Sequence, residues 1–325
     1  MSVMLPIVVD VMGGDNAPKA IIDGSRSASA QGIAVELVGL ASVAENIGSL
    51  KLHEVSQVIG MADEPGRAVR TMKDSSIVRG AERVRDGQAS AMVSAGNTGA
   101  VAAASLLRMK RIPGVSRPAI ATTLPVPGRS PKILLDSGAM ADCQPDWLLQ
   151  FAQMGSAFSR IRYGIEKPKI GLLSIGEEAE KGNQITKAAH VLLRNDNSID
   201  FIGNVEGRDI LDGAVDVVVA DGFTGNVALK TIEGTIKFLV NQIISILLAD
   251  GVGEVGKEAL GLLAPIASEL NPEAVGGAML LGVNGISIIS HGSAGPLAIE
   301  NAIKLARDMV DADLIGALSR AVTAS

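Results

Sequence analysis

Residues 91–109 read AMVSAGNTGAVAAASLLRM, and this stretch contains the unit that decides the fold. A short apolar run at 91–94 is followed by a polar loop rich in glycine, and the loop leads directly into a helical pattern from Val101 to Met109. Strands that alternate with helices in this way are typical of βα units in a parallel sheet. The stretch therefore predicts an α/β protein.

The same order of strand, glycine loop and helix recurs along the chain. The predicted strands are Ile7–Val11, Val35–Gly39, Ala91–Ser94, Ile133–Asp136, Ile170–Ser174, Phe201–Gly203, Val215–Ala220 and Ile286–Ser290. Several are apolar on both faces, as strands covered by helices on each side must be. Loops after parallel strands share the carboxyl edge of the sheet, so we expect their polar residues to converge on one cleft. We predict one three-layer α/β/α unit over residues 1–325, and a bilobed form of it stays open.

The segment 226–270 departs from this rhythm because no strand separates its two helical patterns. In the first pattern, apolar residues from Ile232 to Leu247 recur at spacings of three and four, on one helical face. We therefore expect a helical hairpin that projects from the sheet. The apolar face of this hairpin needs a partner, and we favour a second copy of the chain, whose hairpin would complete a four-helix bundle. Packing of the hairpin against its own domain stays open. A membrane interface is a further candidate, in contact with the residues of the hairpin tip: Leu248, Ala249, Val252 and Val255.

The composition excludes several classes of protein. The chain is 47% hydrophobic with a net charge of −6, which fits a globular protein and gives no reason to expect nucleic acid. Cys143 is the single cysteine, so an intrachain disulfide is excluded, and we interpret it as a core residue rather than a nucleophile. Cysteine-based zinc sites are excluded, and three histidines do not favour a histidine-rich metal site. The N-terminus predicts a strand rather than a secretory signal, so we expect a cytoplasmic protein.

Three glycine loops, each with a hydroxyl side chain, follow predicted strands and begin helices. They are GNTGA (96–100), DGFTGN (221–226) and HGSAGP (291–296). Main-chain N–H groups at a helix start attract phosphate, and glycine lets the anion approach. Each loop alone is equally consistent with a helix cap in a tight turn, but together they predict a site for phosphate or a phosphorylated ligand. The chain lacks GKS, GKT and GxGxxG in these loops, which disfavours ATP-type and dinucleotide binding.

Two further clusters carry charge. The loop GEEAEKGNQ (176–184) contains Lys181, which could neutralise phosphate or an oxyanion, and Asn183, which could donate a hydrogen bond to it. A solvated helix start explains the same residues equally well. The stretch RMKRIPGVSR (108–117) places basic residues at a helix end, where the helix dipole alone favours them. In an acidic protein the cluster could also dock an acidic carrier, through Arg108, Lys110, Arg111 and Arg117.

Many ordered blocks of the sequence resemble one family. The chain is similar to the acyl-ACP:phosphate acyltransferases (the PlsX family) of bacterial phospholipid synthesis, in order from Ile7 to about Ala302. The blocks are VVDVMGGDNAP, MKDSS, VSAGNTGAV, LLDSGAMAD, QFAQMG, GLLSIGEEAEKGN, FIGNVEGRDI, VVADGFTGNVALKTIEG and GGAMLLGVNG.

The resemblance implies a Rossmann-like fold related to isopropylmalate dehydrogenase and phosphotransacetylase. It implies a homodimer, no metal or redox cofactor, and peripheral association with the inner face of the membrane. The implied partners are acyl carrier protein and inorganic phosphate, which would give acyl phosphate. With the loops above, the expected catalytic residues are Lys181, Asn183, Asp221, Asn226 and His291. The expected phosphate- and substrate-binding residues are Asp15, Gly96, Asn97, Thr98, Gly99, Gly222, Thr224 and Gly225.

Two positions depart from the family pattern, and three other functions stay open. Met140 replaces the asparagine of the family's GAN block, and Val275 stands where an aromatic residue is expected. The alternatives are a phosphotransacetylase that uses acyl-CoA, a metal-dependent decarboxylating dehydrogenase, and a non-catalytic membrane scaffold built on the hairpin. Tyr163, the only tyrosine, does not stand in the tyrosine–lysine pattern of those dehydrogenases.

Overall fold

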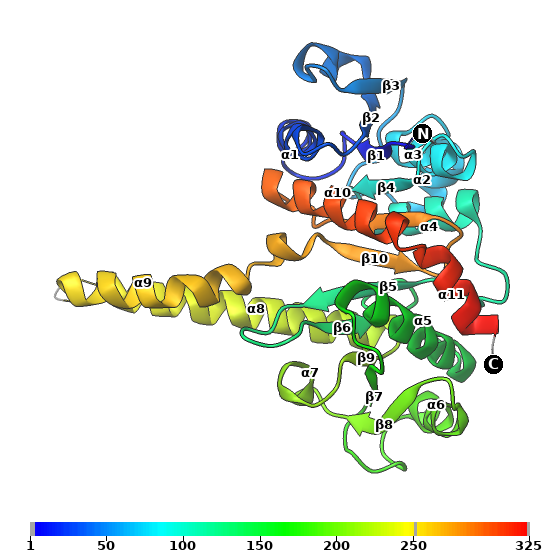
Figure 1. The fold of residues 1–325 in the computed structure, drawn as a ribbon, viewed down its shortest axis with the longest axis vertical. Helices are drawn as coiled ribbons and strands as arrows, with labels where there is room; N and C mark the ends of the chain where they lie inside the picture. The colour runs from blue at the N-terminus through cyan, green and yellow to red at the C-terminus, as the bar shows by residue number, and fades with distance from the viewer. Residues whose placement is uncertain (1–3, 250–251, 324–325) are drawn as a thin grey trace.

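One sheet of 11 strands runs through the protein, in the order β3-β2-β1-β4-β11-β10-β5-β6-β9-β7-β8 (Figure 1). The computed structural model describes residues 4–249 and 252–323. The first five strands of this order are mutually parallel. Their bounds are β3 Lys51–Val55, β2 Val35–Leu40, β1 Ile7–Asp10, β4 Ala91–Ser94 and β11 Ile286–Ile289. The last four are parallel as well, with bounds β6 Lys132–Leu135, β9 Val217–Val219, β7 Lys169–Leu173 and β8 Asp200–Val205.

Two strands that the sequence pattern missed separate these halves, β10 Ala278–Leu281 and β5 Ala119–Leu124. β10 is antiparallel to β11, β5 is antiparallel to β10, and β6 is antiparallel to β5. After three reversals, β6, β9, β7 and β8 run opposite to β1, β4 and β11. The prediction that all glycine loops follow one carboxyl edge of a parallel sheet is therefore wrong. The loops form two groups that leave the sheet in opposite strand directions.

Helices cover both faces of the sheet, which confirms the three-layer architecture. Alternate residues of β1 point to opposite faces, with Ile7 and Val9 in one cluster of core side chains and Val8 in another. The first cluster is continuous beneath five helices, α1 Lys19–Ala30, α10 Pro296–Asp311, α11 Leu314–Thr323, α5 Pro145–Tyr163 and α6 Gln184–Asn195.

The opposite face has two separate clusters. One lies beneath α2 Pro65–Thr71, α3 Ser76–Arg85 and α4 Thr98–Met109, and the other beneath α7 Asp209–Asp212 and the base of α8 Gly222–Leu247. Two 3₁₀ turns, η1 Ala41–Asn46 and η2 Pro272–Val275, complete the elements. No division of the chain into domains follows from these clusters, so the single unit and its bilobed form stay predictions.

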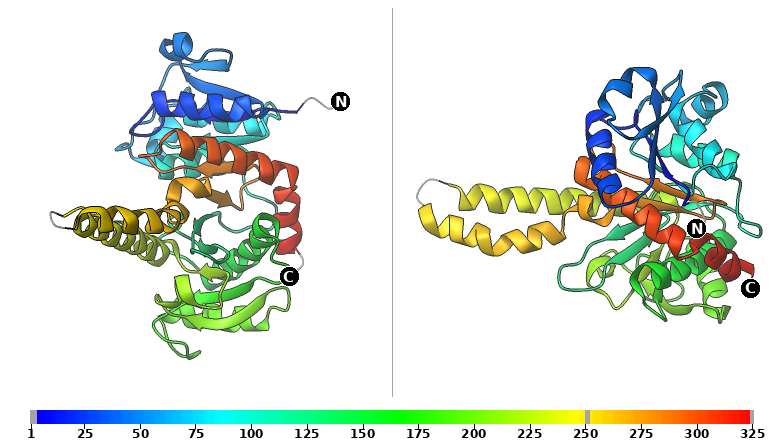
Figure 2. Two further views of the ribbon diagram at one scale, coloured as in Figure 1. Left: turned by 60° about the vertical axis from the view of Figure 1, so that its left-hand side comes forward. Right: turned by 45° about the horizontal axis from the view of Figure 1, so that its top comes forward.

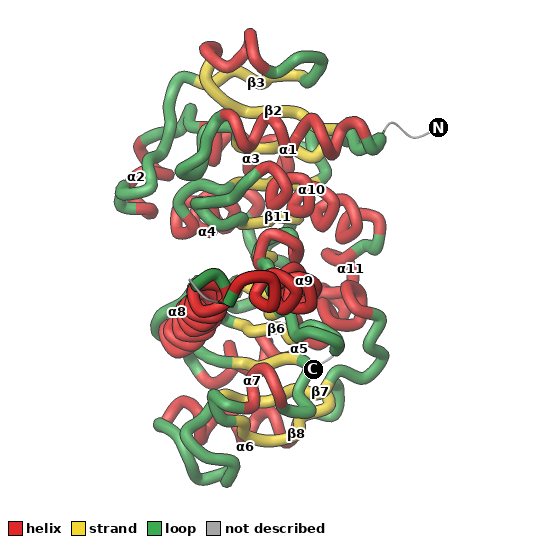
Figure 3. Tube along the Cα trace, turned by 90° about the vertical axis from the view of Figure 1, so that its left-hand side faces the viewer, coloured by secondary structure: helices red, strands yellow, loops and turns green. Residues whose placement is uncertain are grey.

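The expected helical hairpin consists of α8 and α9 Gly253–Glu269, and it projects far from the body of the protein (Figures 1 and 2). Figure 3 shows α8 nearly end-on, with α9 beside it. The two helices meet closely, because a Cβ on Gly256 would lie 1.9 Å from the main-chain oxygen of Leu247. Residues 250 and 251, within the predicted tip, lie outside the described residues. Among the described residues, no helix is both long and apolar enough to cross a membrane.

Candidate active site

Three loops from neighbouring strands β1, β4 and β11 form the first group of predicted site residues. Asp15 N–H donates to the main-chain oxygen of Gly292 at 2.7 Å, and the side-chain amide of Asn16 donates to that of Ser293 at 3.0 Å. The His291 ring lies in the same loop, with Nδ1 2.8 Å from the hydroxyl of Ser293. The structure therefore brings together the loops that carry Asp15 and His291.

Asn97 serves the structure of this group rather than offering a free donor. Its Oδ1 accepts from Ala100 N–H at 3.0 Å and so caps α4, while its Nδ2 donates to the main-chain oxygens of Met61 and Asp63 at 3.0 and 3.1 Å. The next two N–H groups, of Thr98 and Gly99, have no partner among the described residues. The first turn of α4 thus offers two main-chain donors and the exposed Thr98 hydroxyl to an anion.

A buried carboxylate, Asp10, supports two of these loops from below. It accepts from the Ser94 hydroxyl at 2.7 Å and from Met12 N–H at 3.1 Å. Burial raises the pKa of Asp10, although the hydrogen bonds from these groups oppose the rise. The loops after β1 and β4 lie very close to each other, since a Cβ on Gly13 would lie 2.6 Å from both Asp10 Oδ2 and Gly96 N. Glycine at these positions lets the two loops approach each other.

The second group begins at the base of α8. Asp221 caps this helix, since its carboxylate accepts from both the N–H and the hydroxyl of Thr224, at 2.8 and 2.7 Å. Gly222 N–H donates to Met140 O and Gly225 N–H donates to Asp221 O, each at 2.8 Å. Most N–H groups of this first turn are thus taken, so it is a poorer anion site than α4. The side chain of Asn226 is exposed beside Gly138.

The loop between β6 and α5 holds the base of α8 through Asp136. This buried carboxylate accepts from the N–H groups of Ile120, Gly138, Ala139 and Met140 at 2.7 to 3.0 Å. Burial raises the pKa of Asp136 against the effect of those donors. Met140 therefore joins this loop to the base of α8 through its main chain, since its N–H donates to Asp136 and its oxygen accepts from Gly222 N–H.

Cys143 lies in the same region and is buried, as expected for a core residue. Burial raises the pKa of its thiol to about 12, which keeps it protonated and a poor nucleophile at neutral pH.

The strand β7 ends next to β9, and its loop carries Lys181 and Asn183. Asn183 caps α6, since its Oδ1 accepts from Thr186 N–H at 2.8 Å. The N–H groups of Gln184 and Ile185 have no partner among the described residues. The Lys181 amine forms no ion pair with a carboxylate of the described residues. Lys181 and Arg208 line an open pocket of about 620 Å³. A helix start with free N–H groups and an unpaired amine can hold an anion.

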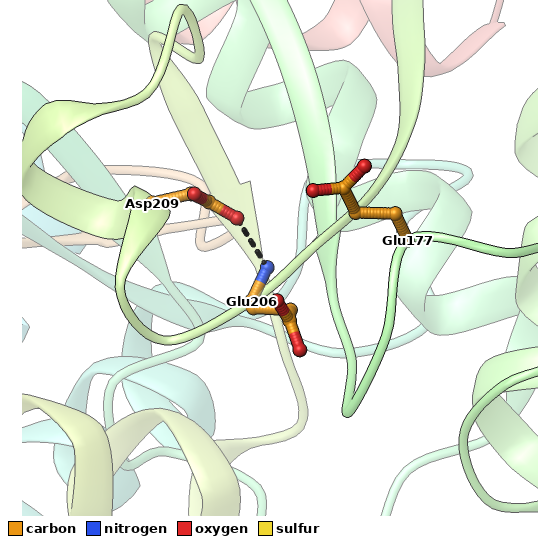
Figure 4. A group of neighbouring side chains, drawn as sticks. All are labelled: Glu177, Glu206 and Asp209. Atoms are coloured by element: carbon orange, nitrogen blue, oxygen red, sulfur yellow. Dashed lines mark hydrogen bonds between the residues drawn. The ribbon is translucent and has the colours of Figure 1, made fainter.

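Three carboxylates beside this pocket, of Glu177, Glu206 and Asp209, lie within 4.8 Å of one another (Figure 4). Asp209 Oδ2 accepts from Glu206 N–H at 2.9 Å, and Arg208 forms ion pairs with all three side chains. The guanidinium supplies a counter-charge for the cluster, which explains the grouping without a metal.

The basic cluster divides into paired and unpaired cations. Arg108 lies 3.5 Å from Glu82 Oε1, Arg111 donates to the main-chain oxygen of Ser116, and Arg117 stacks on the Trp147 ring with its guanidinium carbon 4.5 Å from the centroid. The side-chain amine of Lys110 has no hydrogen-bond or ion-pair partner among the described residues. The structure therefore leaves Lys110 as the cation of this cluster that is free for a partner.

The two groups of predicted residues remain distinct in the structure. One group lies at the ends of β1, β4 and β11, and the other at the ends of β9 and β7; among the described residues, no hydrogen bond or ion pair joins their side chains. Sequence reasoning missed Asp10, Asp136, His190 and Arg208. Asp10 and Asp136 could have been found from the sequence, because each is an acidic residue at the end of an apolar strand, directly before a glycine loop.

Solved structures of low sequence identity share the fold of this protein. The EutD phosphotransacetylase of Staphylococcus aureus aligns with a TM-score of 0.60 at 16% identity, covering 94% of each chain. A 4-hydroxythreonine-4-phosphate dehydrogenase of Klebsiella pneumoniae aligns with a TM-score of 0.53 at 13% identity, covering 94% of this chain and 99% of that one. The protein therefore has the α/β fold of phosphotransacetylases, as the sequence predicted.

Sequence similarity identifies the family. Residues 5–316 match the model of the family described as "Fatty acid synthesis protein". The chain is 47% identical to the phosphate acyltransferase of Anaeromyxobacter dehalogenans over 98% of its length and 91% of that protein's. It is 44% identical to the phosphate acyltransferase of Geobacillus thermodenitrificans, covering 96% and 97%. The chain belongs to the phosphate acyltransferase family of fatty acid and phospholipid synthesis, which confirms the predicted family and enzyme class.

Proposed function

We propose that this enzyme transfers the acyl group of acyl carrier protein to inorganic phosphate. A phosphate oxygen attacks the carbonyl carbon of the thioester and forms a tetrahedral oxyanion. The carbon–sulfur bond then breaks, so that acyl phosphate and the carrier thiolate leave, and the thiolate takes up a proton from water. Phosphate at neutral pH is already partly a dianion, so it needs positioning more than a strong base.

The observation that carries this proposal is the unpaired amine of Lys181, in the loop that leads directly into the free N–H groups at the start of α6. Phosphate binds there, held by the amine and by the N–H groups of Gln184 and Ile185. The Asn183 side chain uses its oxygen for the helix cap, and its Nδ2 has no partner among the described residues. That amide is the donor for the tetrahedral oxyanion.

The remaining predicted residues have supporting parts in this proposal. The first turn of α4 provides a second anion site, which suits the phosphate group on the prosthetic arm of a carrier protein. His291 and Asp15 border it, and Lys110 attracts the acidic carrier. Asp221, Thr224, Gly222 and Gly225 hold the base of α8, and Asn226 faces the substrate from that base.

The hairpin forms the dimer interface and the membrane contact in this proposal. Apolar side chains on α8 and α9 are exposed in the single chain, and among them Leu262 is 81% and Ile246 is 64% exposed. Two hairpins packed as a four-helix bundle cover this surface and make a homodimer. The tip of the hairpin, where Leu248 is 63% and Val255 is 70% exposed, rests on the inner, cytoplasmic face of the membrane. The product, which has a long acyl chain, then forms next to the bilayer.

The experiment measures release of the carrier thiol from palmitoyl-ACP, with hydroxylamine present to trap acyl phosphate. Thiol release with hydroxamate, both dependent on phosphate and insensitive to EDTA, is the expected result. Release from acyl-CoA but not from acyl-ACP would replace the proposal with a phosphotransacetylase. Silence with both donors from folded protein would refute acyl transfer to phosphate and leave the scaffold function.

A further inference from the structure

A buried pair of side chains, His190 and Asn204, lies behind the loop that carries Lys181. His190 comes from α6 and Asn204 from β8, and they are 4% and 6% exposed. His190 Nδ1 lies 2.9 Å from Asn204 Oδ1, and Asn204 Nδ2 donates to the main-chain oxygen of Glu178 at 2.8 Å. The same oxygen accepts from Lys181 N–H at 3.0 Å. Four residues thus form one continuous hydrogen-bonded chain.

The contacts of Asn204 fix the proton on the histidine. A carbonyl oxygen can only accept, so the amide nitrogen of Asn204 must face Glu178 and its Oδ1 must face His190. His190 Nδ1 therefore carries the hydrogen and donates it to Asn204. Nε2 is buried without a partner among the described residues, and the ring packs edge-on against Phe201, with centroids 5.1 Å apart. The protein holds the imidazole in one orientation and one tautomer.

The loop 175–182 has few other ties to the protein. Among the described residues, Asn204 makes the one hydrogen bond that joins its main chain to another element, and the Glu178–Lys181 bond is internal to it. The Arg208–Glu177 ion pair is a contact at 3.7 Å between exposed side chains and is worth little. The position of the Lys181 main chain therefore depends on the amide of Asn204, which depends in turn on His190.

We propose that Asn204 and His190 are positioning residues for acyl transfer, which act by fixing the loop that presents Lys181. The inference rests on the role of Lys181 in the proposed function. Neither side chain touches the substrate. A buried polar chain of this kind is rigid because breaking one bond leaves another buried group without a partner. A loop without that anchor samples positions in which the amine misses the phosphate.

The test combines Asn204→Ala and His190→Leu with a conservative variant, His190→Asn. The amide nitrogen of asparagine stands where Nδ1 stands in histidine, so His190→Asn keeps the donor to Asn204. We expect Asn204→Ala and His190→Leu each to lower kcat about tenfold, with little change in KM for palmitoyl-ACP, and His190→Asn to retain most of the rate. Thermal unfolding of each variant establishes that it folds.

A second measurement separates positioning from a general loss of stability. In the Lys181→Ala background, Asn204→Ala should cost no further activity, because the group that it positions is already gone. Amide hydrogen exchange of Lys181, whose N–H donates to Glu178 O, should be about tenfold faster in Asn204→Ala. It should be unchanged in Asn301→Ala, which removes an equivalent amide bond, from Asn301 Nδ2 to Glu273 O at 3.0 Å.

The outcomes distinguish this inference from the proposed function. If the wild type releases no thiol in a phosphate-dependent way, the proposed function fails, and the exchange measurement alone decides whether Asn204 fixes the loop. If the wild type is active but the Asn204→Ala and Lys181→Ala effects multiply fully, the positioning role is overturned. Unchanged exchange and kcat in folded Asn204→Ala would overturn it as well.

Discussion

The main-chain oxygen of Asp136 lies 1.9 Å from the position that a Cβ on Gly225 would occupy. The first turn of α8 is therefore pressed directly onto the loop after β6, and Gly225 cannot carry a side chain there without moving the helix. Gly222 is in a similar position, since its Cβ would lie 2.6 Å from Asp136 Oδ2. One buried acid thus positions the helix base that presents Asn226.

Gly225→Ala should destabilise the protein and displace the base of α8. The overlap with a fixed main-chain oxygen costs at least about 1–3 kcal/mol, as overpacking of a core does. Gly234→Ala is the matched control in the same helix, because nothing lies within 4 Å of its Cβ position. That change should stabilise the protein by about 0.5–1 kcal/mol through helix propensity. Urea unfolding of both variants measures the difference, and a Gly225→Ala as stable as the wild type would contradict the close contact.

Lys181→Ala should lower kcat about 100-fold, because an amine that stabilises developing negative charge contributes on that scale. Lys187→Ala is the control. This lysine is exposed in the first turn of α6, the helix that the loop leads into, and should leave the rate within about twofold. Steady-state rates at saturating phosphate and palmitoyl-ACP make the comparison. Wild-type turnover of Lys181→Ala under these conditions would remove Lys181 from the mechanism.

Lys110→Ala should raise KM for palmitoyl-ACP about two- to fivefold and leave KM for phosphate unchanged, since an exposed charge at the rim of an interface is worth about 0.2–1 kcal/mol. Added salt should weaken binding of the carrier to the wild type, and so reduce the difference in KM for palmitoyl-ACP between the wild type and Lys110→Ala. Lys51→Ala removes the same charge from the exposed start of the edge strand β3 and should leave both constants unchanged. Equal effects of the two variants would place carrier docking elsewhere.

The buried Asp10 should make stability depend on pH in a defined direction. Burial raises the pKa of Asp10 above its ordinary value of 3.8, so folding favours its protonated form. The contribution of this carboxyl to stability is fully present below pH 3.8 and is lost as the pH rises through the folded-state pKa. Asp10→Asn should therefore gain stability relative to the wild type as the pH rises through that window. Urea unfolding from pH 4 to 8 measures it, and a difference that shrinks with rising pH would reverse the assignment.

Leu262→Glu should convert the proposed homodimer to a monomer, because it places a charge in the apolar surface proposed to lie between two hairpins. Val191→Glu, on the exposed side of α6, is the control and should remain dimeric. Light scattering coupled to size-exclusion chromatography gives the mass of each. A dimeric Leu262→Glu would show that the hairpin is not the interface.

Much of the fold was predictable from local sequence. The strands before glycine loops are continuous apolar runs, and each of those eight predictions falls on an observed strand. The helix caps Asn97, Asn183 and Asp221 stand in the loops that follow such strands, each directly before a helical pattern, so their place at helix starts follows from sequence order. The strands β3, β5 and β10 were missed because they do not follow the βα pattern, and β3 carries polar residues at an edge.

The sequence by itself determined the family, the βα rhythm, the projecting hairpin and the residues in the loops, because each depends on local patterns or on similarity along the chain. Only the tertiary structure decided the reversal at β10 and β5, which divides the loops into two groups. It also decided that Asn97 binds the loop of Met61 and Asp63, and that Asn204 supports Lys181 through Glu178. The physical reason is that strand direction and buried hydrogen bonds join segments far apart in the chain, and no local pattern specifies their partners.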